Sequence, residues 1–189
     1  MLAPRGCGIQ TGAGAVLNML KPTPGASIVV FGAGAVGMAA IMAAALSGAT
    51  MIVAVAVAVD VVASRLELAQ SLGATHIVDP AHQDTAQKVA TLTDGRVDYA
   101  IDATGNSEVL ATAILSRAPL GTVAVIGAPS AGTTAAVDVN FILNGRPIVD
   151  VTAGDSVPQE FLPALAELEP ARLRNRHLCR LHGVWGYCR

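Results

Sequence analysis

The chain has 189 residues, of which 52% are hydrophobic and 14% charged, so it can bury a large core and is not a disordered segment. A formal net charge of -2 offers no positive field for nucleic acid or for an anionic membrane surface, and we expect neither as a partner. Three scattered cysteines and an N-terminus without a signal-peptide pattern lead us to expect a cytoplasmic protein with reduced thiols.

An uncharged stretch runs from residue 22 to residue 59, which is long enough for a membrane-spanning helix. Glycines divide it, and its character changes along its length. Ser27–Phe31 is β-branched and aromatic, residues 39–46 are rich in alanine, and residues 51–59 alternate valine with alanine. Because strands buried on both faces of a parallel sheet are almost continuously apolar, we predict strand, helix and strand here, not one membrane helix.

The next segments continue this alternation. A helix is expected after Asp60, with Ser64 as its N-cap, Glu67 three residues later as the second half of a capping box, and Gly73 at its end. The elements that follow are expected at 75–78 (strand), 84–92 (helix), 97–102 (strand), 107–117 (helix), 122–126 (strand), 135–139 and 148–152 (short strands on either side of a helical turn around Phe141) and 157–168 (helix).

Strands that alternate with helices of this length predict an α/β fold. The crossovers between parallel strands are right-handed and place the helices on both faces of the sheet. We therefore predict a Rossmann-type, doubly wound parallel sheet.

The sequence "GAGAVG", residues 32–37, lies between the first strong strand and the alanine-rich helix and satisfies G-x-G-x-x-G. Gly32 would permit the tight turn, Gly34 would let the backbone approach a pyrophosphate, and Gly37 would let helix and strand pack closely. Free N–H groups at the helix start would face the phosphates. The alternative is an ordinary turn in a glycine-rich chain, but the strand before it and the helix after it favour binding of NAD.

Asp60 ends the second apolar run and is the expected acidic partner of this motif. A carboxylate there accepts hydrogen bonds from the adenosine ribose and repels a 2′-phosphate, which favours NAD over NADP. Asp60 lies somewhat further along the chain than the roughly 20 residues that the motif predicts. A turn or capping role before the next helix is the alternative.

Several segments, in this order, resemble one known family. They are "GCGIQTGAGAVLN", "PGASIVVFGAGAVG", "SRLELAQSLGATHIVDP", "VDYAIDATG", "VAVIGAP", "LNGRPI" and "GDSVPQEF". The chain resembles the coenzyme-binding domain of zinc-containing, medium-chain alcohol dehydrogenases, above all the aryl-alcohol (benzyl alcohol) branch, over about residues 5–168. The resemblance implies hydride transfer between an alcohol or aldehyde, with an aromatic alcohol as one option, and NAD.

The resemblance also implies roles for individual residues. Cys7 takes the position of a catalytic zinc ligand, and Thr11, the expected catalytic residue, that of the threonine against the nicotinamide ring. Residues 148–152 take the place of the edge strand through which such subunits form homodimers. The positions implied to bind the cofactor are Thr11, Gly32, Gly34, Ala35, Val36, Gly37, Asp60, Arg65, Thr104, Gly105, Ile126, Gly127 and Ala128.

The sequence departs from the family around Cys7. The family carries its two other catalytic zinc ligands in an N-terminal domain, whereas Met1 to Pro4 alone precede the matching segment here. We therefore expect a truncated NAD-binding portion in which Cys7 is a vestigial ligand that faces the cofactor cleft and does not retain zinc. Two alternatives stay open: Cys7 is a buried apolar filler, and the chain is a dinucleotide-binding module without activity of its own.

Two further departures concern other segments. The strand before Asp60 is longer than in the family by about four residues, or roughly 13 Å of extended chain. The end of the chain, from Pro170, holds five arginines and no acidic residue, and its His177, Cys179, His182 and Cys188 match no zinc-binding pattern. We expect a link to the catalytic domain plus a first helix in residues 1–20, the NAD-binding domain in 21–168, and a poorly ordered basic tail in 169–189.

Overall fold

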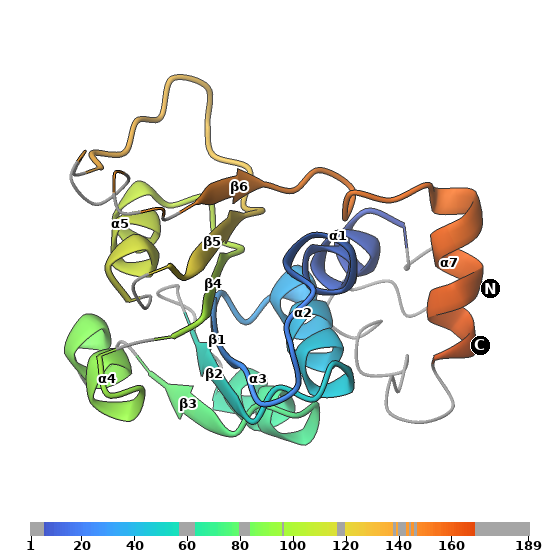
Figure 1. The fold of residues 1–189 in the computed structure, drawn as a ribbon, viewed down its shortest axis with the longest axis horizontal. Coiled ribbons are helices and arrows are strands. Elements are labelled where there is room, and N and C mark those ends of the chain that lie inside the picture. The colour runs from blue at the N-terminus through green and yellow to red at the C-terminus, as the bar shows by residue number, and fades with distance from the viewer. Residues whose placement is uncertain are drawn as a thin grey trace.

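The structure of the chain is a computed structural model, which describes residues 6–56, 63–79, 84–95, 97–116, 120–137, 139, 143, 145 and 147–168. Its strands form one parallel sheet with the order β3-β2-β1-β4-β5-β6. The strands are β1 (Ser27–Phe31), β2 (Met51–Val55), β3 (His76–Val78), β4 (Tyr99–Asp102), β5 (Thr122–Val125) and β6 (Ile148–Asp150). Figure 1 shows them in this order from the lower left to the top.

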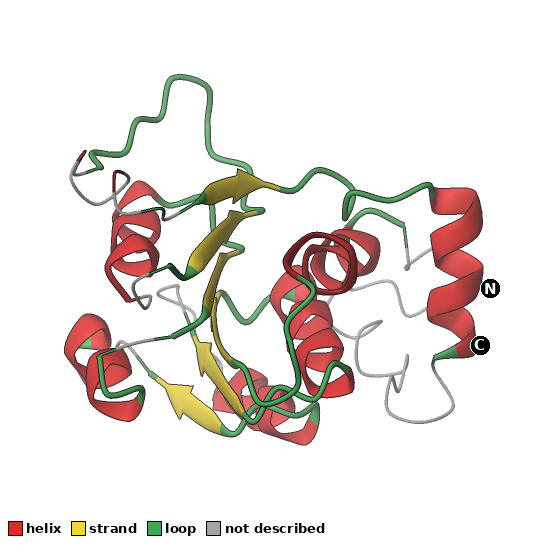
Figure 2. Ribbon diagram, viewed as in Figure 1, coloured by secondary structure: helices red, strands yellow, loops and turns green. Residues whose placement is uncertain are grey.

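Helices cover both faces of the sheet (Figure 2), and two hydrophobic clusters mark the two layers. One layer holds α1 (Gly8–Gly14), the π-helical segment η2 (Ala15–Leu20), α2 (Ala35–Leu46), α3 (Ala63–Ser71) and α7 (Pro158–Glu167). The other layer holds α4 (Thr85–Leu92) and α5 (Ser107–Ser116). The predicted Rossmann-type, doubly wound parallel sheet is therefore confirmed.

The central strand β1 shows why its sequence is apolar throughout. Ile28 and Val30 point into the cluster beneath α2, whereas Val29 and Phe31 point into the cluster beneath α5. All four side chains are fully buried because both faces of the strand are covered. β1 pairs with β2 on one side and with β4 on the other, so the strand order reverses beside it. In open α/β sheets, ligands bind at such a switch point, outside the carboxyl ends of the strands.

The ends of the helices show one predicted signal, one that the sequence analysis did not name, and one error. Asp84 caps α4, where its Oδ1 accepts a hydrogen bond of 3.1 Å from the Gln87 N–H. Gly73 follows α3 with a φ of 122°. The predicted capping box was wrong, because α3 begins at Ala63 and places Ser64 inside the first helical turn. Alanine is a strong helix former, so the helix extends one residue further back.

The predicted strand at 135–139 was also wrong where the structure describes it, since residues 135–137 form a loop. β5 already pairs with β4 on one edge and with β6 on the other, so the loop finds no open edge beside β5. The predicted helical turn around Phe141, the end of the 51–59 strand with Asp60, and the tail at 169–189 lie outside the described residues. Within the described part of the chain, no helix combines the length and apolar character needed to cross a membrane.

Candidate cofactor site at the carboxyl edge of the sheet

The glycine-rich turn connects β1 to α2 at the switch point. Gly32 has a φ of 110°, a conformation that favours glycine, and its N–H donates to the Val55 carbonyl at 2.8 Å. Gly37 lies against the same turn: a Cβ added to it would be 1.8 Å from the Gly32 oxygen. These two glycines are needed to close the turn on the helix.

Gly34 differs from both of its partners in the motif. Its φ of -84° and ψ of -175° suit any residue, and a Cβ added to it would meet none of the described atoms within 4 Å. The described residues therefore show no steric need for glycine at position 34. Because Gly34 has no side chain, the space beside the start of α2 is open.

The start of α2 is suited to an anion. Gly34 is its N-cap and offers no side chain to the first amides, and the first turn carries no acidic residue. The helical hydrogen bonds begin with Met38 N–H to the Gly34 oxygen at 2.9 Å, so the amides of residues 35–37 have no partner within the helix. Ala35 and Val36 are half-buried. Amides in this position, together with the helix dipole, favour a negatively charged group.

The loops after β4 and β5 meet beside this turn. A Cβ on Gly127 would be 2.0 Å from the Gly105 nitrogen, and one on Gly32 would be 3.2 Å from Thr104 Cγ2. The two loops and the glycine turn thus lie together at the carboxyl edge. The structure brings most of the predicted cofactor positions to this edge; those in the two loops are Thr104, Gly105, Ile126, Gly127 and Ala128.

Asp102, at the end of β4, forms hydrogen bonds with both loops. Its side chain is only 1% exposed, and its Oδ1 accepts hydrogen bonds from the Thr104 N–H at 2.9 Å and from the Thr104 hydroxyl at 2.5 Å. Its backbone oxygen accepts from the N–H groups of Ile126 and Gly127 at 2.8 and 3.0 Å. The carboxylate is therefore engaged in holding the loops, a role that the sequence did not reveal.

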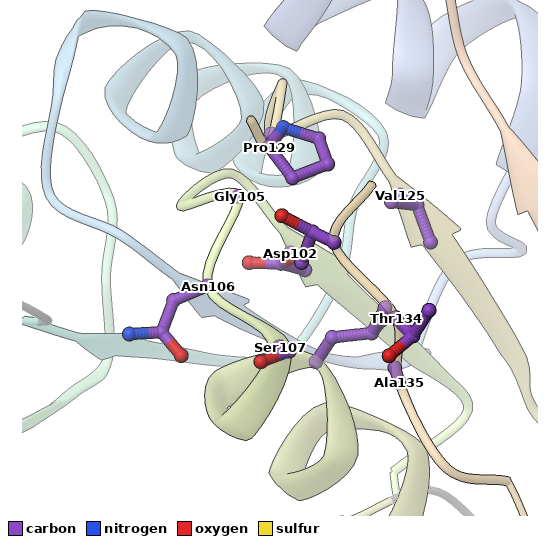
Figure 3. Close-up of a pocket in the computed structure, with 11 residues that line it drawn as sticks. Asp102, Gly105, Asn106, Ser107, Val125, Pro129, Thr134 and Ala135 are labelled. Atoms are coloured by element: carbon purple, nitrogen blue, oxygen red, sulfur yellow. The ribbon is translucent and has the colours of Figure 1, made fainter. Parts of the chain in front are cut away.

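A cavity of about 80 Å³ lies beneath these loops, between the start of α5 and residues 133–135. Figure 3 shows Asp102, Asn106 and Thr134 around it. Asn106 itself caps α5, since its Oδ1 accepts a hydrogen bond of 2.8 Å from the Glu108 N–H. Sites for organic ligands have volumes of roughly 300–1,000 Å³. The cavity is too small for a dinucleotide. It is lined in part by Asp102, which holds the loops in place.

Helix α1 borders the glycine turn from the other side. A Cβ on Gly12 would be 2.0 Å from the Val36 oxygen, so the backbone of α1 lies directly on the first turn of α2 (Figure 1). Thr11, the residue before this contact, is 9% exposed. The fold thus places the expected nicotinamide-side threonine next to the helix start.

Cys7 immediately precedes α1, where its carbonyl oxygen accepts a hydrogen bond of 2.8 Å from the Thr11 N–H. The residue is exposed, so the alternative of a buried apolar filler was wrong. Among the described residues, no group of three or more His, Cys, Asp or Glu side chains could hold a metal ion. Because catalytic zinc needs three protein ligands, the described residues do not fit a zinc site.

Arg65 is an exposed residue in the first turn of α3. Asp60 lies outside the described residues, as do the tail residues His177, Cys179, His182 and Cys188.

Comparison with known proteins places this geometry in a family. Residues 35–169 match the model of the zinc-binding dehydrogenases. A geraniol dehydrogenase of Castellaniella defragrans is 37% identical over 174 residues, which are 90% of this chain and 45% of the relative.

Two solved structures share both fold and sequence with the chain. A benzyl alcohol dehydrogenase from Acinetobacter calcoaceticus is 48% identical with a TM-score of 0.83, over 89% of this chain and 46% of that one. An alcohol dehydrogenase zinc-binding domain protein from Burkholderia ambifaria is 48% identical with a TM-score of 0.86, over 93% of this chain and 47% of that one. The chain spans about half the length of the relatives it matches. Since the family match covers most of the chain and includes the helix that starts at the glycine turn, the predicted resemblance is confirmed and the chain belongs to the zinc-binding dehydrogenase family.

Proposed function

We propose that the chain binds NAD along the carboxyl edge of its sheet and is the cofactor-binding portion of an alcohol dehydrogenase. The observation that supports this most directly is the contrast between Gly37, which the fold requires, and Gly34, which it does not. An open glycine beside three amides that have no partner within the helix is what a pyrophosphate needs in order to approach the backbone.

The proposal assigns each part of the edge a task. The amides of residues 35–37 would hold the pyrophosphate, and Asp60 and Arg65 would lie toward the adenosine ribose. Thr104, Gly105 and residues 126–128 would line the adenosine and nicotinamide sides, with Thr11 against the nicotinamide ring. Bound NAD would take a hydride from the alcohol carbon, while the hydroxyl proton passes to solvent. Small-molecule alcohols, aromatic ones included, are the proposed substrates; we also propose a cytoplasmic location.

NAD should bind more tightly than NADP, because the Asp60 carboxylate repels a 2′-phosphate. Isothermal titration of both cofactors against the unmutated chain and Asp60→Ala would measure the difference. We expect NADP to be weaker by roughly tenfold, corresponding to about 1.4 kcal/mol, and the difference to shrink in the variant. Equal affinities in the unmutated chain would mean that the carboxylate does not reach the ribose.

A second candidate function is a dinucleotide-binding module without activity of its own. The presence of Cys7 as the single described residue at a zinc-ligand position favours it, since one thiolate leaves the ion mostly hydrated.

Incubation of the purified chain with NAD, zinc and benzyl alcohol, followed by the absorbance of NADH, tests whether this chain oxidises the alcohol by itself. We expect no NADH and no zinc after dialysis. NADH formation together with stoichiometric zinc that is lost in Cys7→Ser would show that further ligands exist and that the chain is an active oxidoreductase.

We also propose that the chain forms a homodimer through residues 148–152. Among the described strands, β6 ends the sheet and pairs only with β5. Leu120 and Leu143 are about three-quarters exposed, and Leu120 lies near this edge, with its Cδ2 3.4 Å from the position of a Cβ on Gly145. Unpaired strand edges with apolar neighbours favour association. Sedimentation velocity would contradict the proposal if it shows monomers at micromolar concentrations.

A further inference from the structure

Gln10 is a buried polar residue on α1 whose side chain forms hydrogen bonds with the turn that follows β6. Its side chain is 3% exposed, and its amide nitrogen donates to the Ala153 oxygen at 3.1 Å and to the Ser156 hydroxyl at 3.0 Å. The Ser156 hydroxyl in turn donates to the Ala153 oxygen at 2.8 Å. One side chain of α1 is thus connected to both ends of the turn that follows β6.

The same turn touches α1 and η2 through two further residues. A Cβ on Gly14 would be 2.2 Å from the Gly154 oxygen, so the two backbones are in direct contact. The Gly154 oxygen also accepts a hydrogen bond of 2.9 Å from the Asn18 side-chain amide. Gln10, Gly14 and Asn18 together hold the turn along the length of α1 and η2.

The backbone of this turn is strained. Ala153, Gly154 and Asp155 have φ values of 51°, 70° and 46°, and two of the three are not glycine. Each left-handed residue other than glycine costs roughly 1–2 kcal/mol and persists where the surroundings hold it in place. Strain of this kind clusters at functional sites, as do π-helical segments such as η2. The turn is held by its own hydrogen bonds, from the Asp155 N–H to the Thr152 oxygen and from the Ser156 hydroxyl to the Ala153 oxygen, and by the contacts to α1 and η2.

We propose that Gln10 and residues 153–156 form a clamp that sets where α1 lies on the first turn of α2, which makes Gln10 a positioning residue for Thr11. The inference rests on the proposed function, in which Thr11 contacts the nicotinamide end of NAD. α1 meets α2 through the backbone of Gly12 beside the Ala39 side chain, and Ile9 and Ala13 of α1 lie in the same apolar cluster as the side chains of α2. Apolar contacts have little directionality, so the hydrogen bonds of the clamp add the directional restraint. Its loss should affect the nicotinamide end of the cofactor and spare the pyrophosphate and adenosine, which contact other elements.

The test compares Gln10→Met, which keeps the length of the side chain but removes the donor, with the unmutated chain. Isothermal titration would give the affinities for NADH and for ADP-ribose, which lacks the nicotinamide. We expect NADH to bind roughly tenfold more weakly, as for one or two lost hydrogen bonds that are partly buried, and ADP-ribose to change less than about twofold. The fluorescence of bound NADH should also approach that of free NADH, since the nicotinamide is less constrained.

Ser27→Ala is the matched control. The Ser27 hydroxyl donates to Asp98 Oδ2 at 2.8 Å and accepts from the Asp98 N–H at 3.0 Å, so it also joins distant segments, but at the amino edge of the sheet. It should lower the stability and leave both affinities unchanged. Should Gln10→Met fold poorly, Ser156→Ala removes one acceptor of the clamp from a half-buried position, and we expect a selective loss of about threefold for NADH.

The outcomes separate the two proposals. Equal losses for NADH and ADP-ribose, or no loss for either, would overturn the clamp and leave NAD binding in place. The clamp would also be overturned if the unmutated chain bound NADH and ADP-ribose equally well. Equal affinities would mean that the nicotinamide end contributes nothing to binding, so Thr11 would have no contact for the clamp to position. Failure of the unmutated chain to bind either ligand would overturn the proposed function and, with it, the inference.

Discussion

Gly34→Ala is expected to weaken NAD binding by roughly 100-fold or more without unfolding the protein. The added methyl group meets no described atom within 4 Å, and the backbone at position 34 is in an extended conformation that alanine adopts freely. The free energy of unfolding should therefore change by less than about 0.5 kcal/mol. The methyl group would, however, occupy the space through which a pyrophosphate reaches the amides of residues 35–37.

The loss of affinity follows from those amides. Each hydrogen bond from an amide to a charged oxygen contributes roughly 1.5–3 kcal/mol, so losing one or two of them should weaken binding by roughly 100-fold or more. Isothermal titration with NAD and urea unfolding on the same preparation would give both quantities. Undiminished affinity in a stable Gly34→Ala protein would show that the pyrophosphate binds elsewhere.

Gly37→Ala is expected to lower the stability of the fold, whereas Gly34→Ala leaves it nearly unchanged. The added Cβ would be 1.8 Å from the Gly32 oxygen, 3.0 Å from the Gly32 carbonyl carbon and 3.4 Å from Val30 Cγ1. Two of these atoms belong to the backbone of Gly32, whose φ is 110°. A backbone atom in a tight turn cannot move aside as the end of a flexible side chain can. The helix must shift away from β1, which should cost roughly 3 kcal/mol of stability.

Urea unfolding would measure that cost, and NAD binding should fall as well because the amides at the start of α2 move with the helix. Gly34→Ala is the matched control, since both variants add one methyl group within the same turn. A Gly37→Ala protein as stable as the unmutated chain would contradict the close contact between helix and turn. The two variants together separate what the glycines do for the fold from what they do for the ligand.

The sequence by itself determined the fold class and the place of the glycine turn. The signals for these features are local: the β-branched run of Ser27–Phe31 and the spacing of Gly32, Gly34 and Gly37 act over a few residues. Hydrogen bonds and side-chain contacts at such short separations depend little on the rest of the chain, so a pattern predicts them. The family resemblance rests on the same segments.

Only the tertiary structure decided how these segments meet. Whether residues 135–137 become a strand depends on a free edge beside β5, which β6 already occupies. The burial of Asp102 and the exposure of Cys7 depend on neighbouring loops and helices. The Gln10 side chain donates a hydrogen bond to a residue 143 positions away, and no local sequence pattern predicts such a contact. Such polar groups find their partners through long-range packing, which is why the sequence predicted the glycine turn and not the hydrogen bonds of Gln10.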